Sequence, residues 1–226
     1  MELYIVRHGI AKSNLKETAR YVPNPAYESL TDIDDSLLTP KGEVQANLTG
    51  MRLAKVNFDA VLTSPILRAV QTAAGIVRHQ QEDKTIEILY DLAECMNYEY
   101  PLVSPERFAP LWKDVKIADG NPDYGGKLPY ETEEESFDRA LRVSEYVRSR
   151  FKGDEKVLLV SHGGFMCAYL LLALTDIPRE KRNIYRLHAD HCGITKIKYT
   201  EDGMISVICI DSTYHLKNVV EDTKFR

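Results

Sequence analysis

The sequence predicts an α/β fold of three layers, with helices on both faces of a mostly parallel central sheet. Short apolar runs alternate with segments of helical periodicity along most of the chain, which is typical of parallel strands joined by helices. The run 156–160 is continuously apolar after its first lysine, as expected of a central strand buried on both faces. Near the end, two apolar runs joined by Glu201-Asp202-Gly203 predict an added antiparallel hairpin.

The first strand is predicted at residues 3–6, and it ends at Arg7 and His8. Because ligands bind at the carboxyl ends of the strands in an open α/β sheet, these two side chains are placed where chemistry usually occurs. The polar stretch 11–16 indicates a short helix or an irregular segment, and the proline-containing residues 21–38 indicate a loop.

A helix is predicted to follow this loop. Thr39 provides an N-cap and Pro40 occupies the first helical position. Val44, Leu48 and Met51 recur at helical spacing, so we assign them to the buried face.

The next predicted strand, 58–63, runs into Ser64-Pro65, a second cap-and-proline helix start. A third short strand is predicted at 85–89. The buried face of the helix between these strands is predicted to carry Ile66, Val70, Ala73 and Val77.

Regularity fails between residues 95 and 131, where prolines interrupt the chain and tyrosines and Trp112 supply aromatic surface. Because long loops in compact domains tend to be functional, we interpret 95–131 as an irregular insertion over the site. Residues 1–226 then form a single domain that carries 95–131 as a cap-like segment.

A long helix is predicted after this insertion, because Thr132 and Glu135 have the spacing of a capping box. The last strands are predicted at 194–199 and 204–210. The core positions expected in the long helix are Phe137, Leu141, Val147 and Phe151.

Composition restricts the function classes. The net charge of −5 over 226 residues provides no basic field for nucleic acid or for an anionic membrane. The longest strongly apolar run, about 165–174, is too short to cross a bilayer. The four cysteines contain no Cys-x-x-Cys pair, and with no signal segment they indicate a reduced, cytoplasmic protein. No sequence pattern indicates an oligomeric state.

Two strands end alike, in Arg7-His8-Gly9 and in Ser161-His162-Gly163. A third strand-to-helix turn carries Arg68. If the three strands are parallel, two histidines and two arginines gather at one edge of the sheet beside helix N-termini. Guanidinium groups match phosphate oxygens and a neutral imidazole is a nucleophile toward phosphorus, so this cluster predicts a site for a tetrahedral dianion.

The chain resembles the histidine phosphatase superfamily, the phosphoglycerate-mutase-like group, in an ordered set of motifs. The motifs occur in the family's order and span nearly the whole chain. They are Arg7-His8-Gly9, Asn14, Leu38-Thr39-Pro40-Lys41-Gly42, Gln45-Ala46, Ser64-Pro65, Arg68-Ala69, Gln71-Thr72-Ala73, Leu92, Glu94, Glu135-Ser136-Phe137, Ser161-His162-Gly163-Gly164, Asp211 and His215-Leu216.

The resemblance implies a metal-independent and cofactor-free phosphatase acting on a small phosphate ester. It makes His8 the nucleophile that forms a phosphohistidine, and Glu94 the general acid and then the base for water. Arg7, Arg68 and His162 would hold the equatorial oxygens. Asn14 and Gly163 would support the phosphate.

Several of these residues have a second interpretation. Glu94 follows a short strand, where a glutamate is commonly a solvated acid, and Asn14 is equally a turn or cap residue. The capping box explains Glu135 without chemistry, and Gln71 and Thr72 are expected to support the helix and its packing. His188, Asp190, His191 and Cys192 are potential metal ligands, but adjacent ligands rarely complete a tetrahedral site. We expect no metal there and interpret that stretch as structural.

The sequence departs from the family's pattern at two places. Ile10 stands where Glu or Gln is frequent, and residues 97–131 contain Arg107 but no adjacent arginine pair of the kind that binds the mutase substrate. Hydrolysis is therefore favoured, and a phosphoglycerate-mutase-type phosphotransferase is the alternative. A third hypothesis is a phospholigand-binding module without turnover, although both His8 and Glu94 are present. The substrate itself is not identified.

Overall fold

The computed structural model describes residues 1–15, 37–95, 100–101, 114–119, 127–175, 177, 181 and 184–217. Within them the three-layer α/β fold is confirmed, and a seven-stranded sheet in the order β5-β3-β2-β7-β1-β8-β9 forms the middle layer. Its strands are β1 (Glu2–Arg7), β2 (Ala60–Thr63), β3 (Thr85–Ile88), β5 (Lys116–Asp119), β7 (Lys156–Ser161), β8 (Ile194–Tyr199) and β9 (Ile205–Ser212).

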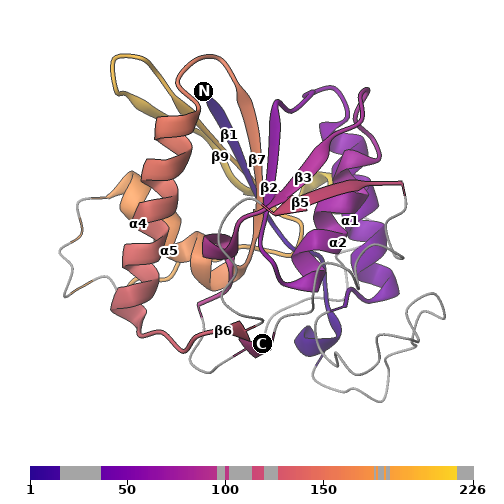
Figure 1. Ribbon diagram of the computed structural model, residues 1–226, viewed down its shortest axis with the longest axis horizontal. Coiled ribbons are helices and arrows are strands. Elements are labelled where there is room, and N and C mark those ends of the chain that lie inside the picture. The colour runs from indigo at the N-terminus through magenta and orange to yellow at the C-terminus, as the bar shows by residue number, and fades with distance from the viewer. Residues whose placement is uncertain are drawn as a thin grey trace.

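The strands from β5 to β1 run parallel, and β8 and β9 form the predicted antiparallel hairpin. β1 and β7 are direct neighbours, paired from Glu2 with Lys156 to Arg7 with Ser161. Their interior residues are buried, which explains why both sequences are almost continuously apolar. Both strands end at the edge of the sheet opposite the N-terminus (Figure 1).

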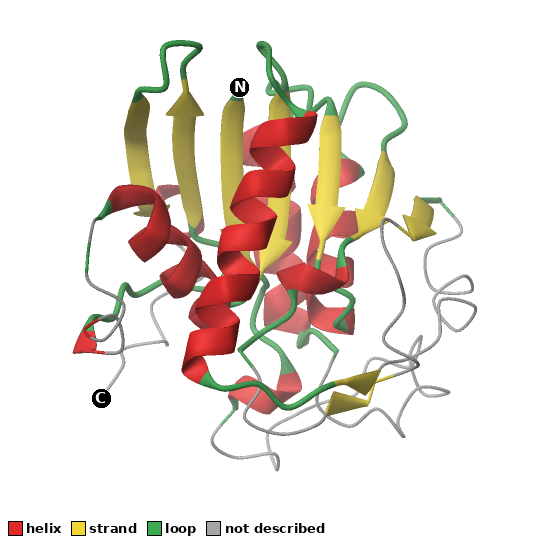
Figure 2. Ribbon diagram, turned by 60° about the vertical axis from the view of Figure 1, so that its left-hand side comes forward, coloured by secondary structure: helices red, strands yellow, loops and turns green. Residues whose placement is uncertain are grey.

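Helices cover both faces of the sheet. α1 (Pro40–Leu53) and α2 (Leu67–Val77) pack together on one face, and α4 (Glu133–Arg150) and α5 (Gly163–Leu174) pack together on the other. Figure 2 shows α4 in front of its face of the sheet, where it runs roughly along the direction of the strands. The two faces of β1 and β7 therefore belong to two separate hydrophobic cores.

The buried face of α1 differs from the prediction. Val44 and Met51 are 48% and 57% exposed, because α1 approaches α2 through small residues. A Cβ on Gly50 would lie 2.8 Å from the carbonyl oxygen of Gly75 in α2, so larger side chains do not fit between these helices. The buried residues of α1 are Gly42, Gln45, Ala46, Thr49, Gly50 and Leu53.

Two smaller corrections concern α2 and α4. α2 begins at Leu67, two residues beyond Pro65, and it is buried nearly all round instead of on one face. In α4 the capping box of Thr132 and Glu135 is confirmed, but Leu141 is 44% exposed. The buried residues that carry α4 onto the core are Phe137, Ala140, Val143 and Val147, with Phe151 just beyond the helix.

The structure describes only parts of the segment 95–131. Residues 116–119 form β5, which pairs in parallel with β3 at the edge of the main sheet, so the prediction of irregular structure was wrong there. β4 (Tyr100–Pro101) and β6 (Lys127–Leu128) form a separate two-stranded ribbon. Trp112 and Arg107 lie outside the described residues, as does most of the loop predicted at 21–38.

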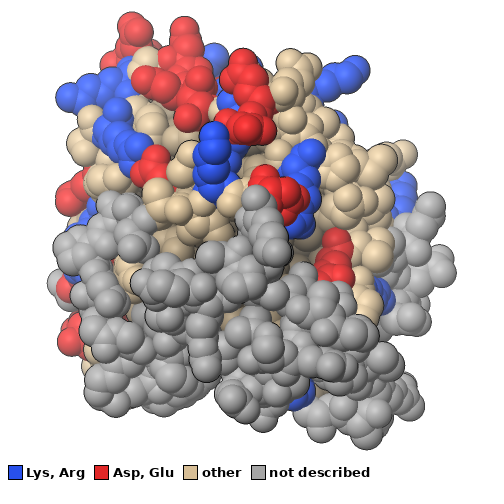
Figure 3. Space-filling view, turned by 45° about the vertical axis from the view of Figure 1, so that its right-hand side comes forward, with Lys and Arg blue, Asp and Glu red and all other residues tan. Residues whose placement is uncertain are grey.

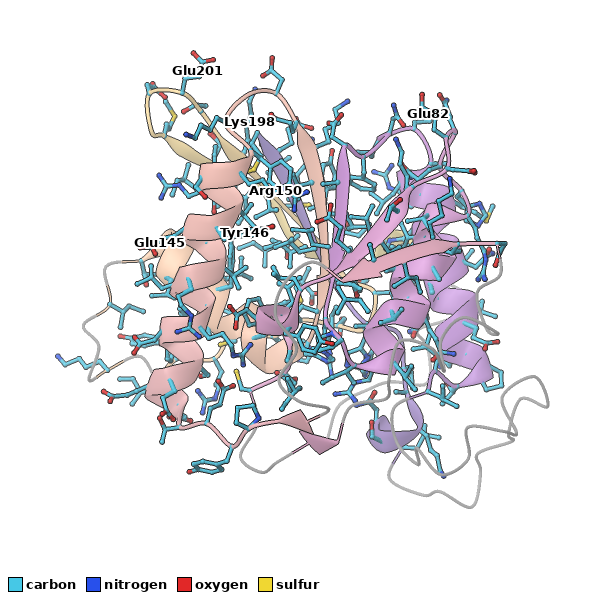
Figure 4. The ribbon with its side chains drawn as sticks, viewed as in Figure 1. Glu82, Glu145, Tyr146, Arg150, Lys198 and Glu201 are labelled. Atoms are coloured by element: carbon cyan, nitrogen blue, oxygen red, sulfur yellow. The ribbon has the colours of Figure 1, made fainter. Side chains whose placement is uncertain are left out.

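The end of the sheet where the parallel strands begin carries solvated charges. Figure 4 shows Glu82, Lys198 and Glu201 at this end of the molecule, away from the carboxyl ends of the parallel strands. On the face drawn in Figure 3, basic and acidic side chains are interspersed over the described residues, in keeping with the net charge of −5. Within the described chain, no helix combines the length and apolar character needed to span a bilayer.

Candidate active site

The two histidines that follow β1 and β7 meet at the carboxyl edge of the sheet. Because Arg7 pairs with Ser161 in the β1–β7 register, the next residue of each strand emerges at the same level. The rings of His8 and His162 lie 5.0 Å apart, centre to centre, and both residues are almost fully buried. The predicted convergence of the two histidines is confirmed.

The hydrogen bonds of His8 define which of its nitrogens carries a lone pair. Nδ1 lies 2.7 Å from the carbonyl oxygen of Gly9, and a carbonyl only accepts, so Nδ1 bears the hydrogen. Nε2 accepts a hydrogen bond from Nε of Arg68 at 3.1 Å. Arg68 is also buried. The structure therefore presents His8 as a neutral imidazole whose Nε2 faces a guanidinium.

The electrostatic surroundings keep His8 neutral. Burial, followed by the positive charge of Arg68 and then by His162, His191 and Arg7, holds the pKa of His8 well below its ordinary value of 6.5. The pKa of His162 is lowered in the same way, first by burial and then by Arg68 and Arg7. A lone pair on Nε2 of His8 is thus available at neutral pH.

His162 and Arg7 each have one buried nitrogen that makes no hydrogen bond with the described residues. These are Nδ1 of His162 and Nε of Arg7. Nε2 of His162 lies 2.7 Å from the Ser64 hydroxyl, so when Ser64 donates, Nδ1 carries the hydrogen and is a free donor. Because buried donors are nearly always paired in native proteins, these two nitrogens point to an acceptor that the protein itself does not supply.

Glu94 lies at the N-terminus of α5. Its carboxylate accepts hydrogen bonds from the backbone N–H groups of Cys95 at 2.9 Å, Phe165 at 3.0 Å and Gly164 at 3.3 Å. A Cβ on Gly164 would lie 2.6 Å from Oε1 of Glu94, so only glycine leaves room for the carboxylate. Glu94 is also close enough to Arg7 to interact with it electrostatically. The structure thus fixes Glu94 at the site and does not leave it as an unattached surface acid.

Arg139 holds the segment that carries Glu94, and the sequence analysis missed it. This buried residue of α4 donates to the carbonyl oxygens of Asp91 at 2.7 Å, Ala93 at 2.8 Å and Glu94 at 3.1 Å. It also pairs with Glu131. An arginine in a helix of mixed composition carries no sequence signal for such a role, because the carbonyls that it binds are distant in the chain.

His191 is a second residue that the sequence analysis missed. Its ring lies 5.2 Å from that of His8, and its Nδ1 donates to the carbonyl oxygen of His8 at 3.0 Å. Burial and the nearby Arg7 lower the pKa of His191 to about 3. The interpretation of the stretch around His191 as purely structural was therefore incomplete.

Polar side chains of the helices fix the loop that follows His8. Thr72 accepts from Gly9 N–H at 3.0 Å, and Gln45 accepts from Ile10 N–H at 3.0 Å. Gln71 similarly accepts from Leu38 N–H at 2.7 Å, so Gln71 and Thr72 hold the loop as well as their helix. The Ile10 side chain is buried.

Asn14 acts as a local cap in this structure. Its Oδ1 accepts from the backbone N–H of Ala11 at 2.9 Å across the short 3-10 helix Lys12–Asn14, and its side chain is exposed. The capping interpretation of Asn14 is thus confirmed, and a phosphate contact stays a prediction. Gly163 begins α5, and a Cβ there would lie 3.4 Å from Nε of Arg7.

The residues proposed above as potential metal ligands do not form one cluster. Cys192 packs in an apolar group with Leu38 and Leu216, whereas His188 and Asp190 lie next to Asp211 of β9. All four cysteines are free thiols.

Comparisons with known proteins agree with this geometry. The family model of the histidine phosphatase superfamily (branch 1) matches residues 3–211. "Putative phosphoserine phosphatase 2" of Hydrogenobacter thermophilus is 28% identical over 220 residues, which cover 96% of this chain and 98% of that protein. "Broad-specificity phosphatase YOR283W" of Saccharomyces cerevisiae is 23% identical over 100% of this chain and 93% of its own length. The solved structure of Bacillus stearothermophilus YhfR shares the fold with a TM-score of 0.63 and 24% identity, covering 95% of this chain and 98% of that one.

Proposed function

This chain belongs to the histidine phosphatase superfamily and is a phosphatase, and we propose that it hydrolyses phosphate monoesters through a phosphohistidine on His8 without a metal ion. One observation carries the proposal. The lone pair on Nε2 of His8 lies among donors that the protein leaves for an anion, namely Arg68, which contacts it, and the unpartnered nitrogens of Arg7 and His162.

In the first chemical step, Nε2 of His8 attacks phosphorus and the bond between phosphorus and the leaving oxygen breaks. Arg7, Arg68 and His162 compensate the charge on the equatorial oxygens, where it collects in the transition state. Glu94 gives a proton to the leaving oxygen, so that an alcohol departs instead of an alkoxide. The neutral form of His8 enforced by burial is the form that this step requires.

In the second step, water attacks the phosphohistidine and releases inorganic phosphate. Glu94, which has lost its proton in the first step, takes one from the water. The breaking bond is now that between phosphorus and Nε2, and His8 returns to its neutral state. The donors that held the first transition state hold the second, because the same phosphoryl group is transferred.

Gly163 lies beside the Arg7 guanidinium and is proposed to contact the phosphate. Asn14 is proposed to approach the phosphate from the loop after β1. The substrate is proposed to be a small phosphate ester. Residues 1–226 are proposed to act as one domain with 95–131 as a cap-like insertion, and the four free thiols support a cytoplasmic location.

Assay of an aryl phosphate in the presence of EDTA tests the proposal. The unaltered protein is expected to release phosphate, and the His8→Ala variant is expected to fall to background while it melts like the unaltered protein. Full activity of His8→Ala, or loss of all activity to EDTA, would contradict the proposal. A mutase would instead depend on a bisphosphate and transfer phosphate between hydroxyls without net release, so phosphate release also separates the two alternatives.

A further inference from the structure

A group of metal-ligating side chains lies outside the histidine cluster. His188 and Asp190 come from the segment before β8, and Asp211 comes from β9. One ligand atom of each residue lies within 4.8 Å of the others, and Nε2 of His188 is 2.9 Å from Oδ1 of Asp190. A divalent cation about 2.0–2.2 Å from nitrogen and oxygen ligands brings such atoms together with little movement.

The backbone holds the two carboxylates close to each other. The N–H of Asp190 donates to Oδ1 of Asp211 at 2.8 Å. A Cβ on Gly193 would lie 1.8 Å from the same oxygen, so this loop accepts the Asp211 carboxylate only because residue 193 is glycine. Asp211 itself has a φ of 50°, a conformation that is uncommon for residues other than glycine. Local backbone geometry thus places two like charges side by side, where a cation would relieve their repulsion.

We propose that His188, Asp190 and Asp211 form a binding site for a divalent transition metal ion. The mixed imidazole and carboxylate donors suit Zn²⁺, Co²⁺ or Ni²⁺ better than Mg²⁺ or Ca²⁺, which prefer oxygen ligands throughout. Three protein ligands leave positions for water. His188 is exposed and the two aspartates are half-buried, so the ion has access from solvent.

The site is connected to the residues that are proposed to bind phosphate. The segment between its ligands accepts a hydrogen bond from Arg7 at the carbonyl oxygen of Ala189, 2.6 Å away, and donates from Cys192 N–H to the carbonyl oxygen of Arg7 at 3.0 Å. Asp190 and Asp211 also interact electrostatically with Arg7. A bound cation offsets these two negative charges, and it therefore strengthens the attraction of Arg7 for an anion.

This connection predicts a reciprocal effect, and that part rests on the proposed function. If the metal ion tightens phosphate binding by some factor, phosphate tightens metal binding by the same factor. The ion regulates the site and takes no part in the reaction, so the hydrolysis described above continues in EDTA.

The test is titration of the EDTA-treated full-length protein with Co²⁺, followed by visible absorption and by calorimetry. We expect one equivalent to bind and to give the absorption bands of a coordinated ion. His188→Ala is expected to lose this binding, and Asp211→Asn to weaken it at least about tenfold. His79→Ala is the matched control, because His79 is a histidine bonded to Asn47 at 2.7 Å on another part of the surface.

The proposed site would be overturned if the unaltered protein bound no Co²⁺. It would also be overturned if His188→Ala bound Co²⁺ as well as His79→Ala does. The His8→Ala protein is expected to bind Co²⁺ like the unaltered protein, so failure of the proposed function leaves this test intact. Calorimetry of inorganic phosphate with and without Co²⁺ then measures the coupling, expected to be about fivefold or more. An unchanged phosphate affinity would overturn the coupling to Arg7.

Discussion

Arginines at the carboxyl edge of the sheet are used in two different ways. Arg139 donates to backbone carbonyls and pairs with Glu131, so its charge and donors are matched by the protein. Arg68 donates to a neutral histidine, and Arg7 has a buried Nε without a partner in the described chain. No ion pair is formed by Arg7 or Arg68 within that part of the molecule. Matched donors fix structure, whereas unmatched donors are available to a ligand.

Arg139→Met is expected to destabilise the fold strongly. Glu131, whose side chain is 13% exposed, then loses its ion pair with Arg139, and three carbonyl oxygens lose their donor. We therefore expect a loss of about 3–5 kcal/mol in the free energy of unfolding. Urea denaturation measures it. Arg142→Met on the same helix is the control, since the Arg142 side chain is 56% exposed and its contact with Asp91 is 3.8 Å long. Equal effects of the two substitutions would contradict the assignment of Arg139 to structure.

Arg68→Met is expected to give the reverse pattern. Removing one donor aimed at transition-state charge typically costs about 10²–10³-fold in kcat, while unfolding free energy stays the same or rises because a buried cation is lost. Steady-state assays with an aryl phosphate measure kcat, and urea denaturation of the same preparation measures the free energy of unfolding. A variant that unfolds easily yet keeps its kcat would show that Arg68 is a structural arginine like Arg139.

Glu94→Gln tests how the leaving group is protonated. The amide keeps the size of the side chain but cannot deliver a proton, so hydrolysis of an alkyl phosphate is expected to slow by about 10²-fold or more. An aryl phosphate, whose leaving group needs little protonation, is expected to slow much less. Rate ratios of the two esters measure this, and equal slowing of both esters would argue that Glu94 only positions its neighbours.

The smallest expected effect concerns the pH dependence of stability. The pKa of His162 is far below 6.5 in the folded protein, so below that pH the unfolded chain takes up a proton that the folded chain refuses. The contribution of neutral His162 to the free energy of unfolding is therefore complete above pH 6.5. It is lost as the pH falls, by about 1.4 kcal/mol per pH unit. His162→Gln is expected to flatten the fall in unfolding free energy between pH 6 and pH 5 by that amount. An identical slope in both proteins would contradict a buried neutral His162.

The convergence of His8 and His162 was predictable from the sequence, because two apolar runs ending in a histidine specify two parallel strands and one shared edge. The buried face of α1 was not predictable in this way, because its contact with α2 depends on Gly50 and Gly75. A search for apolar side chains at helical spacing does not include glycine. Val44 was therefore assigned to the wrong face.

His191 and Arg139 were beyond sequence reasoning for a related reason. Each acts through backbone carbonyl oxygens. His191 donates to that of His8, and Arg139 donates to those of Asp91, Ala93 and Glu94. Every residue has a carbonyl, so the partner leaves no trace in the sequence. β5 was missed because its four residues, Lys116–Asp119, are too short to show a period among the surrounding prolines.

Trapping the intermediate shows whether Nε2 of His8 takes the phosphoryl group. A ³²P-labelled phosphate ester is mixed with the protein, turnover is quenched in alkali, and the labelled peptide is mapped by mass spectrometry. Acid-labile phosphate is expected on His8, and none in the His8→Ala variant. Label on any other residue, or steady turnover with no labelled protein at any time point, would contradict this role of His8.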